Sequence, residues 1–283
     1  MKQHLSIILC GLLLLITSCS DYTKVQKTTD YLYKYETAKQ YYAEGQYNRA
    51  SLLLQDIVSM LKGTDKGEES LYLMAMANLK ARNYDAAASY FKKYYQSYPR
   101  GLFAEEARYN CGKALFMDTP EPKLDQTDTY EAVTEFQNFL ELYPTSRFRE
   151  DAQNKIFELQ DKLVEKEYLS AKLYYNLGSY FGNCTSGGSN YQACIVTAEN
   201  AIKDYPYTTR REDFAILILK AKFELAEQSI ELKKEERYHN AIDEYYNFIN
   251  EFPESTFLKE AKSHFEKAKK HIHLDENSSD YLK

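Results

Sequence analysis

The sequence predicts an all-α protein, a solenoid of stacked helix pairs, from three observations. A pattern of one alanine, two further apolar residues and a proline recurs along the chain, as in Ala87, Phe91, Tyr94 and Pro99. Spacings of four and three place the apolar residues on one helical face, and the proline then ends the helix. No strand-like alternation persists, and there are only ten glycines and six prolines. Because a single helix pair cannot bury its own apolar face, neighbouring pairs must stack.

Further copies of this pattern mark the second helix of each pair. They comprise two clear copies, one weaker copy and a degenerate first copy without proline, namely Ala132, Phe136, Phe139, Pro144; Ala241, Tyr245, Phe248, Pro253; Cys194, Ala198, Ala201, Pro206; and Ala50, Leu54, Ile57. The recurring pattern therefore predicts about five helix pairs.

The first residues predict a targeting segment that is not part of the fold. Lys2 and His4 precede an apolar run from Leu5 to Ile16, which is shorter than the roughly 20 residues of a membrane-spanning helix. The small residues before Cys19 then resemble the lipobox of bacterial lipoproteins, which implies a signal peptide over residues 1–18 and an acylated Cys19. The alternative is an ordinary cleaved signal; Cys10 is a poor rival because bulky Leu9 precedes it.

Residues 19–29 are predicted to form the lipidated cysteine and a polar tether, and residues 30–272 the solenoid. The expected helices, in chain order, are Asp30–Glu44 with Tyr47–Leu61; Glu68–Ala81 with Tyr84–Ser97; a helix from Leu102 with Thr129–Leu142; Phe148 to about Glu165 and Tyr168–Leu177 with Tyr191–Asp204; Arg211 to about Leu232 with Tyr238–Glu251; and the capping helix Thr256–Ile272. Residues 273–283 read as a polar tail.

Turns and insertions separate these helices. Gly45 suits a left-handed helix end, Arg82–Asn83 forms the next turn, and the charged stretch Lys233–Arg237 is expected to form the last one. Two insertions, Asp118–Asp128 with its prolines and Gly178–Asn190 rich in Gly, Ser and Asn, are expected to be loops.

The repeat resembles the tetratricopeptide repeat, since small residues (Ala38, Ala75, Gly112) occupy the close-packing position of the first helices. That resemblance implies a right-handed α-solenoid. The junctions Pro144–Phe148 and Pro253–Phe257 resemble those of periplasmic repeat lipoproteins, and the segment Glu167–Tyr180 resembles the fourth-repeat signature of the BamD family. BamD is the lipoprotein of the outer-membrane β-barrel assembly machine. The two insertions depart from the best-known members of that family.

The resemblance implies a non-catalytic scaffold, lipid-anchored in the outer membrane and facing the periplasm. Its C-terminal repeats would dock on the barrel-insertase subunit (BamA-like), and its N-terminal repeats would receive unfolded outer-membrane protein segments. The tether lacks the acidic cluster that resembles a surface-export signal, which favours the periplasmic side. The alternatives are another periplasmic repeat lipoprotein, in pilus biogenesis or as an envelope and division scaffold, and an enzyme or nutrient-binding lipoprotein built on a repeat platform.

We find no catalytic motif in the sequence and expect no cofactor, metal or small-molecule substrate. The net charge of −6 argues against nucleic-acid binding. His271 and His273 read as a solvated end rather than as a metal pair. Cys184 and Cys194 flank the second insertion and form a possible disulfide in an oxidising compartment, whereas the alternative is a buried Cys194 in the core.

The predicted site is a peptide-binding groove along the first helices of the pairs. In tetratricopeptide solenoids this helix lines the concave face, so the candidates are counted from its small residue: Tyr35, Lys39, Tyr42, Tyr72, Met76, Leu79, Tyr109, Lys113 and Phe116. Several of these rings could equally be core. The groove would be aromatic and partly basic, which suits an extended peptide with a C-terminal aromatic residue and a carboxylate.

A second candidate site is the adjacent pair Arg210 and Arg211 after Pro206, where two cations are not expected to be needed for packing. Arginine forms planar, bidentate pairs with carboxylates, so the pair is a candidate contact for an acidic partner domain. The alternative is a helix start whose arginines contact their own chain.

Overall fold

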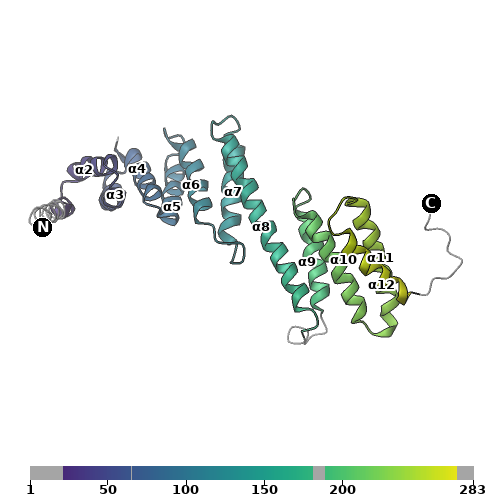
Figure 1. Ribbon diagram of the computed structural model, residues 1–283. Helices are drawn as coiled ribbons and strands as arrows, with labels where there is room; N and C mark the ends of the chain where they lie inside the picture. Colours follow the sequence, from purple (N-terminus) through teal and green to yellow (C-terminus); the bar gives the residue numbers. More distant parts are fainter. Residues whose placement is uncertain (1–21, 65, 181–188, 273–283) are drawn as a thin grey trace, which may run out of the picture. The chain divides into compact units, whose positions relative to one another are not determined.

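The computed structural model describes residues 22–64, 66–180 and 189–272, and within these ranges the regular structure is helical, without strands (Figure 1). Each helix packs against the next along the chain, as the large shared interfaces of α2 with α3, α3 with α4, α4 with α5 and α5 with α6 show. The prediction of an all-α solenoid is confirmed.

The helices follow the predicted order. Their bounds are α2 (Tyr31–Ala43), α3 (Tyr47–Leu61), α4 (Gly67–Lys80), α5 (Tyr84–Ser97), α6 (Ala104–Asp118), α7 (Thr127–Leu142), α8 (Arg149–Leu177), α9 (Asn190–Asp204), α10 (Arg211–Glu227), α11 (Glu231–Glu251), α12 (Leu258–Ala268) and the 3-10 turn η2 (Lys269–His271).

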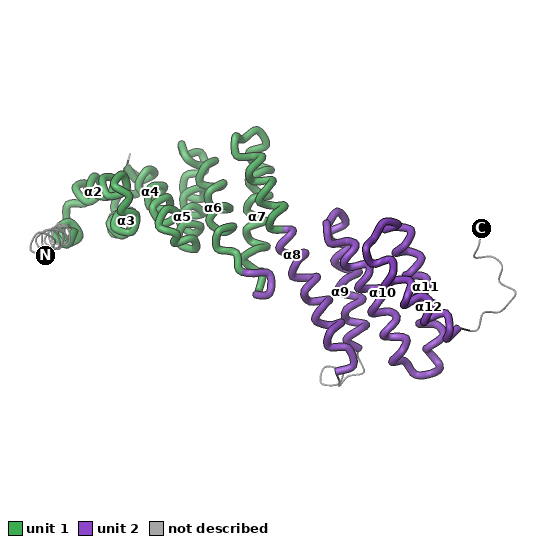
Figure 2. Tube along the Cα trace, viewed as in Figure 1, with its two compact units in different colours: residues 1–120, 125–159 green, residues 121–124, 160–283 purple. Residues whose placement is uncertain are grey.

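The chain forms two compact units (Figure 2). One comprises residues 1–120 and 125–159, and the other comprises residues 121–124 and 160–283. Each unit has its own buried clusters of side chains. We therefore describe each unit by itself.

The repeated alanine and aromatic residues form the core of the first unit. Ala87, Phe91 and Tyr94 on α5 are fully buried, as are Ala132, Phe136 and Phe139 on α7 and Ala50, Leu54 and Ile57 on α3. Gly112 on α6 lies against one of these rings, because a Cβ there would come within 2.9 Å of Phe136. The small residues thus set how closely the helices approach.

In the second unit the weaker copy of the pattern has the same role. Cys194, Ala198 and Ala201 on α9 are buried, together with Phe214 and Ile218 of α10. On α11, Ala241 and Phe248 are buried as well.

Proline ends the second helices as expected. Four of them stop two residues before a proline: α5 before Pro99, α7 before Pro144, α9 before Pro206 and α11 before Pro253. The reason is that the residue before proline disfavours the helical conformation. Gly45, at the predicted first turn, has φ of +79°, a left-handed conformation that glycine adopts without a steric penalty.

Two predicted boundaries are wrong. Residues 148–177 were expected as two helices, but α8 is one continuous helix. The charged stretch Lys233–Arg237 was expected as a turn, but it lies inside α11, and the chain turns at residues 228–230. Its residues are strong helix formers and solvated, and Lys234 pairs with Glu231 at 3.4 Å within the first turn of α11.

The predicted tether is also partly structured. Residues 22–27 are helical, and Val25 is buried in the same cluster as Leu53 and Leu54 of α3. The apolar side chain of Val25, at a position that reads as tether, is what fixes this segment to the first repeat.

Candidate functional site

Three of the predicted groove residues are core residues. Tyr35, Tyr72 and Tyr109 occupy equivalent positions on α2, α4 and α6, and their exposed fractions are 1, 9 and 6%. They cannot offer open ring surface to a peptide, because neighbouring helices already cover them. The expectation of an exposed aromatic row is corrected at these positions.

The hydroxyl groups of these tyrosines face carboxylates of the following pair. Tyr35 donates a hydrogen bond of 2.6 Å to Glu69 on α4, and Tyr109 donates one of 2.5 Å to Asp151 on α8. Burial and then these hydrogen bonds raise the pKa of both tyrosines above the usual value. Each such Tyr–carboxylate bond ties a first helix to the first helix of the next pair.

The middle member of this series lacks its bond. The hydroxyl of Tyr72 is buried without a hydrogen-bond partner among the described residues, although Glu106 on α6 stands where Glu69 and Asp151 stand in the other pairs. Burial, followed by the charge of Glu106, raises the pKa of Tyr72. Glu106 instead makes an ion pair of 3.5 Å with Arg147. The first unit therefore contains a buried tyrosine hydroxyl whose hydrogen bond is not formed within the described part of the chain.

Six predicted groove residues are half-buried, as a binding face requires. We call them the groove face: Lys39, Tyr42, Met76, Leu79, Lys113 and Phe116. Lys39 pairs with Glu69 at 3.0 Å, so one of the two cations of the groove face is already neutralised within the chain. Lys113 makes no ion pair within the described part of the chain. That these residues bind a peptide stays a prediction.

Sequence reasoning missed the polar side chains beside the groove face. Asn110 on α6 donates to the sulfur of Met76 at 3.7 Å, and Lys155 on α8 lies 4.6 Å from the ring of Phe116. Burial, and after it Tyr47 and the charge of Glu106, raise the pKa of Tyr42. Acidic residues recur in the first turns of α4, α6 and α8, and that period could have revealed Glu69, Glu106 and Asp151. The face is of mixed charge rather than basic.

A second repeated contact, in which a side chain stacks on a tyrosine of a first helix, explains the position of Arg210. Phe103 stacks on Tyr72 and Phe148 stacks on Tyr109, both with ring centroids 4.3 Å apart. Both phenylalanines lie four residues after a proline, and so does Arg210.

The guanidinium of Arg210 lies 4.4 Å from the ring of Tyr168, in the place that phenylalanine takes in the other pairs. It also pairs with Glu165 and, at 3.1 Å, with Asp213. The expectation that Arg210 is not required for packing is wrong. Its flat guanidinium replaces an aromatic ring against a tyrosine.

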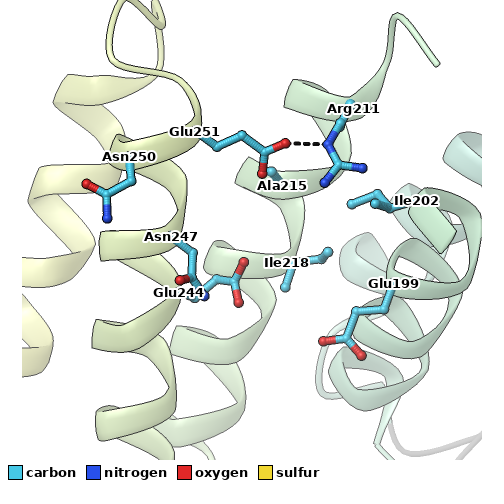
Figure 3. A pocket seen from close by; sticks show the side chains of 9 residues that line it. All are labelled: Glu199, Ile202, Arg211, Ala215, Ile218, Glu244, Asn247, Asn250 and Glu251. Atoms are coloured by element: carbon cyan, nitrogen blue, oxygen red, sulfur yellow. Dashed lines mark hydrogen bonds and ion pairs between the residues drawn. The ribbon is translucent and has the colours of Figure 1, made fainter. Parts of the chain in front are cut away.

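Arg211 lies at one end of a groove in the second unit (Figure 3). The groove has a volume of about 600 Å³, and α9, α10 and α11 line it. Arg211 pairs with Glu251 of α11, so both arginines contact their own chain, as in the second interpretation of the pair. The carboxylates of Glu199 and Glu244 face each other across the groove, and Lys222 pairs with both, at 3.5 and 2.6 Å. A partner contact at Arg211 stays a prediction.

The cysteines that the structure describes are buried. Cys194 fills the repeat's alanine position with no exposed surface, and burial raises the pKa of the Cys111 and Cys194 thiols to about 12. Cys19, Cys184 and His273 lie outside the described residues, so the lipidation and the possible disulfide stay predictions.

Two kinds of feature are absent from the described residues. No helix among them combines the length and the apolar character needed to cross a membrane. Over the same ranges, no cluster of three or more His, Cys, Asp or Glu side chains is arranged to hold a metal ion.

Known proteins with similar sequences point to one family. The model of the family YfiO, described as an outer membrane lipoprotein, matches residues 27–185. A protein of Aquifex aeolicus (strain VF5) named "Putative outer membrane protein assembly factor BamD" is 31% identical over 176 residues, which are 62% of this chain and 57% of that protein. The outer membrane protein assembly factor BamD of Pasteurella multocida (strain Pm70) is 24% identical over 169 residues, 56% of this chain and 65% of that protein. The matches thus span 57% and 65% of the lengths of these two relatives.

Proposed function

Because this chain belongs to the YfiO family of outer membrane lipoproteins, the family of the BamD assembly factors, we propose that it is a non-catalytic scaffold of outer-membrane β-barrel assembly. The observation that carries the proposal is the family match over residues 27–185, which includes every residue of the groove face. In this proposal Cys19 carries the lipid that anchors the protein in the outer membrane, facing the periplasm.

The first unit is the proposed receptor for unfolded outer-membrane protein segments. The groove face supplies an adaptable methionine, two rings and the unpaired cation of Lys113 at equivalent positions of three pairs. Rings bury a large area at low entropic cost, and methionine repacks around different ligands.

The second unit is the proposed docking site for the barrel insertase. Its groove between α9 and α11 offers apolar side chains, Ile202 and Ile218, below a rim of charged and amide groups. A polar rim around an apolar floor is typical of protein interfaces. Arg211 is the cation at the end of this groove and the residue through which an acidic partner would compete with Glu251.

Affinity purification of the lipidated protein from detergent-solubilised membranes tests the proposal. We expect mass spectrometry to recover the β-barrel insertase, and depletion of the protein to lower the level of outer-membrane barrels. Recovery of pilus or division proteins, with barrel levels unchanged, would indicate that the protein is a scaffold in one of those processes instead. The variant Cys19→Ala tests the anchor separately and should release the protein from membranes.

Crosslinking tests the groove face. A photoreactive residue at position 76 or 113 should crosslink to a urea-denatured outer-membrane protein after dilution. The matched control is position 93, an exposed lysine on the second helix α5. Equal crosslinking at all three positions would remove the groove face from the proposal.

A further inference from the structure

The segment that follows the proposed lipid anchor is fixed to the first repeat. Tyr22 lies 6.0 Å from the ring of Tyr41, and the guanidinium of Arg49 lies 5.3 and 5.8 Å from these two rings. Val25 is buried with residues of α3. Residues 22–27 are therefore packed against the first repeat.

Chain length then limits how far the repeat can lie from the membrane. Tyr22 is three residues from Cys19, and three residues reach about 11 Å at most. This step rests on the proposed lipidation of Cys19. With lipid on Cys19, the packed Tyr22 stays within about 11 Å of the headgroups, and the beginning of α2 is only a short loop away.

Three consecutive apolar side chains are exposed at the beginning of α2. Tyr31, Leu32 and Tyr33, which we call the α2 patch, have exposed fractions of 43, 45 and 54%. They form the first turn of α2, and Asp30 caps this turn by accepting hydrogen bonds from the backbone N–H groups of Leu32 and Tyr33. The cap fixes the backbone that presents the patch.

We propose that the α2 patch is a membrane contact and that its occupant is the surface of the bilayer that holds the lipid of Cys19. Tyrosine is favoured at the headgroup level because its ring is apolar and its hydroxyl remains hydrated. The short connection keeps the bilayer within reach of the patch. One lipid anchor and one protein contact together orient the first repeat, whereas the anchor alone leaves it free to rotate.

Depth-dependent fluorescence quenching tests this contact. The full lipidated protein carries Cys184→Ser and one added cysteine, Leu32→Cys, labelled with an environment-sensitive dye; Cys111 and Cys194 are buried and stay unlabelled. The matched control is Leu142→Cys, another exposed leucine of the first unit. Both proteins are reconstituted into phosphatidylethanolamine and phosphatidylglycerol vesicles that contain brominated phospholipid.

We expect the dye at position 32 to be quenched several-fold more strongly than the dye at position 142, with its emission shifted to the blue. Equal or absent quenching in protein that carries lipid by intact mass would overturn the contact and leave the anchor intact. Protein that carries no lipid would overturn both the anchor and this inference. The circular dichroism of each variant shows that it is folded.

Discussion

Tyr109 and Asp151 are joined by a hydrogen bond of 2.5 Å, and the equivalent Tyr72 and Glu106 are not. The same chain thus contains a formed and an unformed copy of one contact. The difference predicts that one substitution has different effects on stability at two equivalent tyrosines.

Tyr109→Phe should lower the free energy of unfolding by about 1 kcal/mol, because it leaves Asp151 without its hydroxyl donor. Tyr72→Phe should leave that free energy unchanged or raise it slightly, because it removes a buried hydroxyl without a partner. Urea denaturation followed by circular dichroism measures both, with the exposed Tyr130→Phe as control. Equal losses at positions 72 and 109 would show that Tyr72 is hydrogen-bonded in solution.

The contact of Tyr35 with Glu69 predicts a pH dependence. The hydrogen bond from Tyr35, and after it Lys39 and Lys66, hold the pKa of Glu69 below its usual value against the effect of burial. A lowered pKa in the folded state adds stability above the unfolded pKa of about 4.3, and this stability is lost as the pH falls through the folded pKa.

The difference in unfolding free energy between the native chain and Glu69→Gln should therefore be largest above about pH 5 and shrink towards pH 3. Denaturation at a series of pH values gives this difference. A difference that is constant over the whole range would mean that Glu69 has the same pKa in both states.

The stacking of Arg210 on Tyr168 predicts which replacement is tolerated. Arg210→Ala should lower the free energy of unfolding by about 1 kcal/mol, because it removes the stacked group and its ion pairs. Arg210→Phe should recover most of this loss, since phenylalanine takes that place in two other pairs. Thermal denaturation distinguishes the two variants.

The same variant separates packing from partner binding. Arg210→Phe keeps the stacked ring position and removes the charge. If Arg210 acts only within the chain, this variant should co-purify with the native partner at the native level. If a folded, membrane-bound Arg210→Phe protein loses the partner, Arg210 contributes to partner binding as well as to packing.

The close approach of Gly112 and Phe136 predicts that adding one methyl group at position 112 lowers the stability of the protein. Gly112→Ala places a Cβ about 2.9 Å from the ring of Phe136, so the helices or the ring must move. Overpacking costs about 1–3 kcal/mol, which outweighs the gain of about 0.5–1 kcal/mol from the better helix propensity of alanine. Denaturation should show a net loss, and the double variant with Phe136→Leu should lose less than the sum of the two single changes. A stabilised Gly112→Ala protein would contradict this packing.

The sequence by itself determined the helices and the stacked architecture. The alanine positions, their aromatic partners and the prolines recur with a helical period, and local rules of spacing and helix ending act on them directly. The turn at Gly45 and the non-helical stretch between α6 and α7 follow from local preferences of the same kind, whereas most of the second predicted insertion lies outside the described residues. One of the two boundary errors falls at Lys233–Arg237, because charge alone does not separate a turn from a solvated helix; the other is the division of α8 into two helices.

Only the tertiary structure decided which side chains of a repeat face outward. Tyr35, Tyr72 and Tyr109 share their period with the groove face, but neighbouring helices bury them. Arg210 shares with Phe103 and Phe148 its place four residues after a proline, but its charge hides the packing role that its contact with Tyr168 of another helix shows. Glu106, the carboxylate at the sequence position where a partner for Tyr72 is expected, pairs instead with Arg147, which lies 41 residues away along the chain. These contacts join residues far apart along the chain, so a period within one helix carries no information about them.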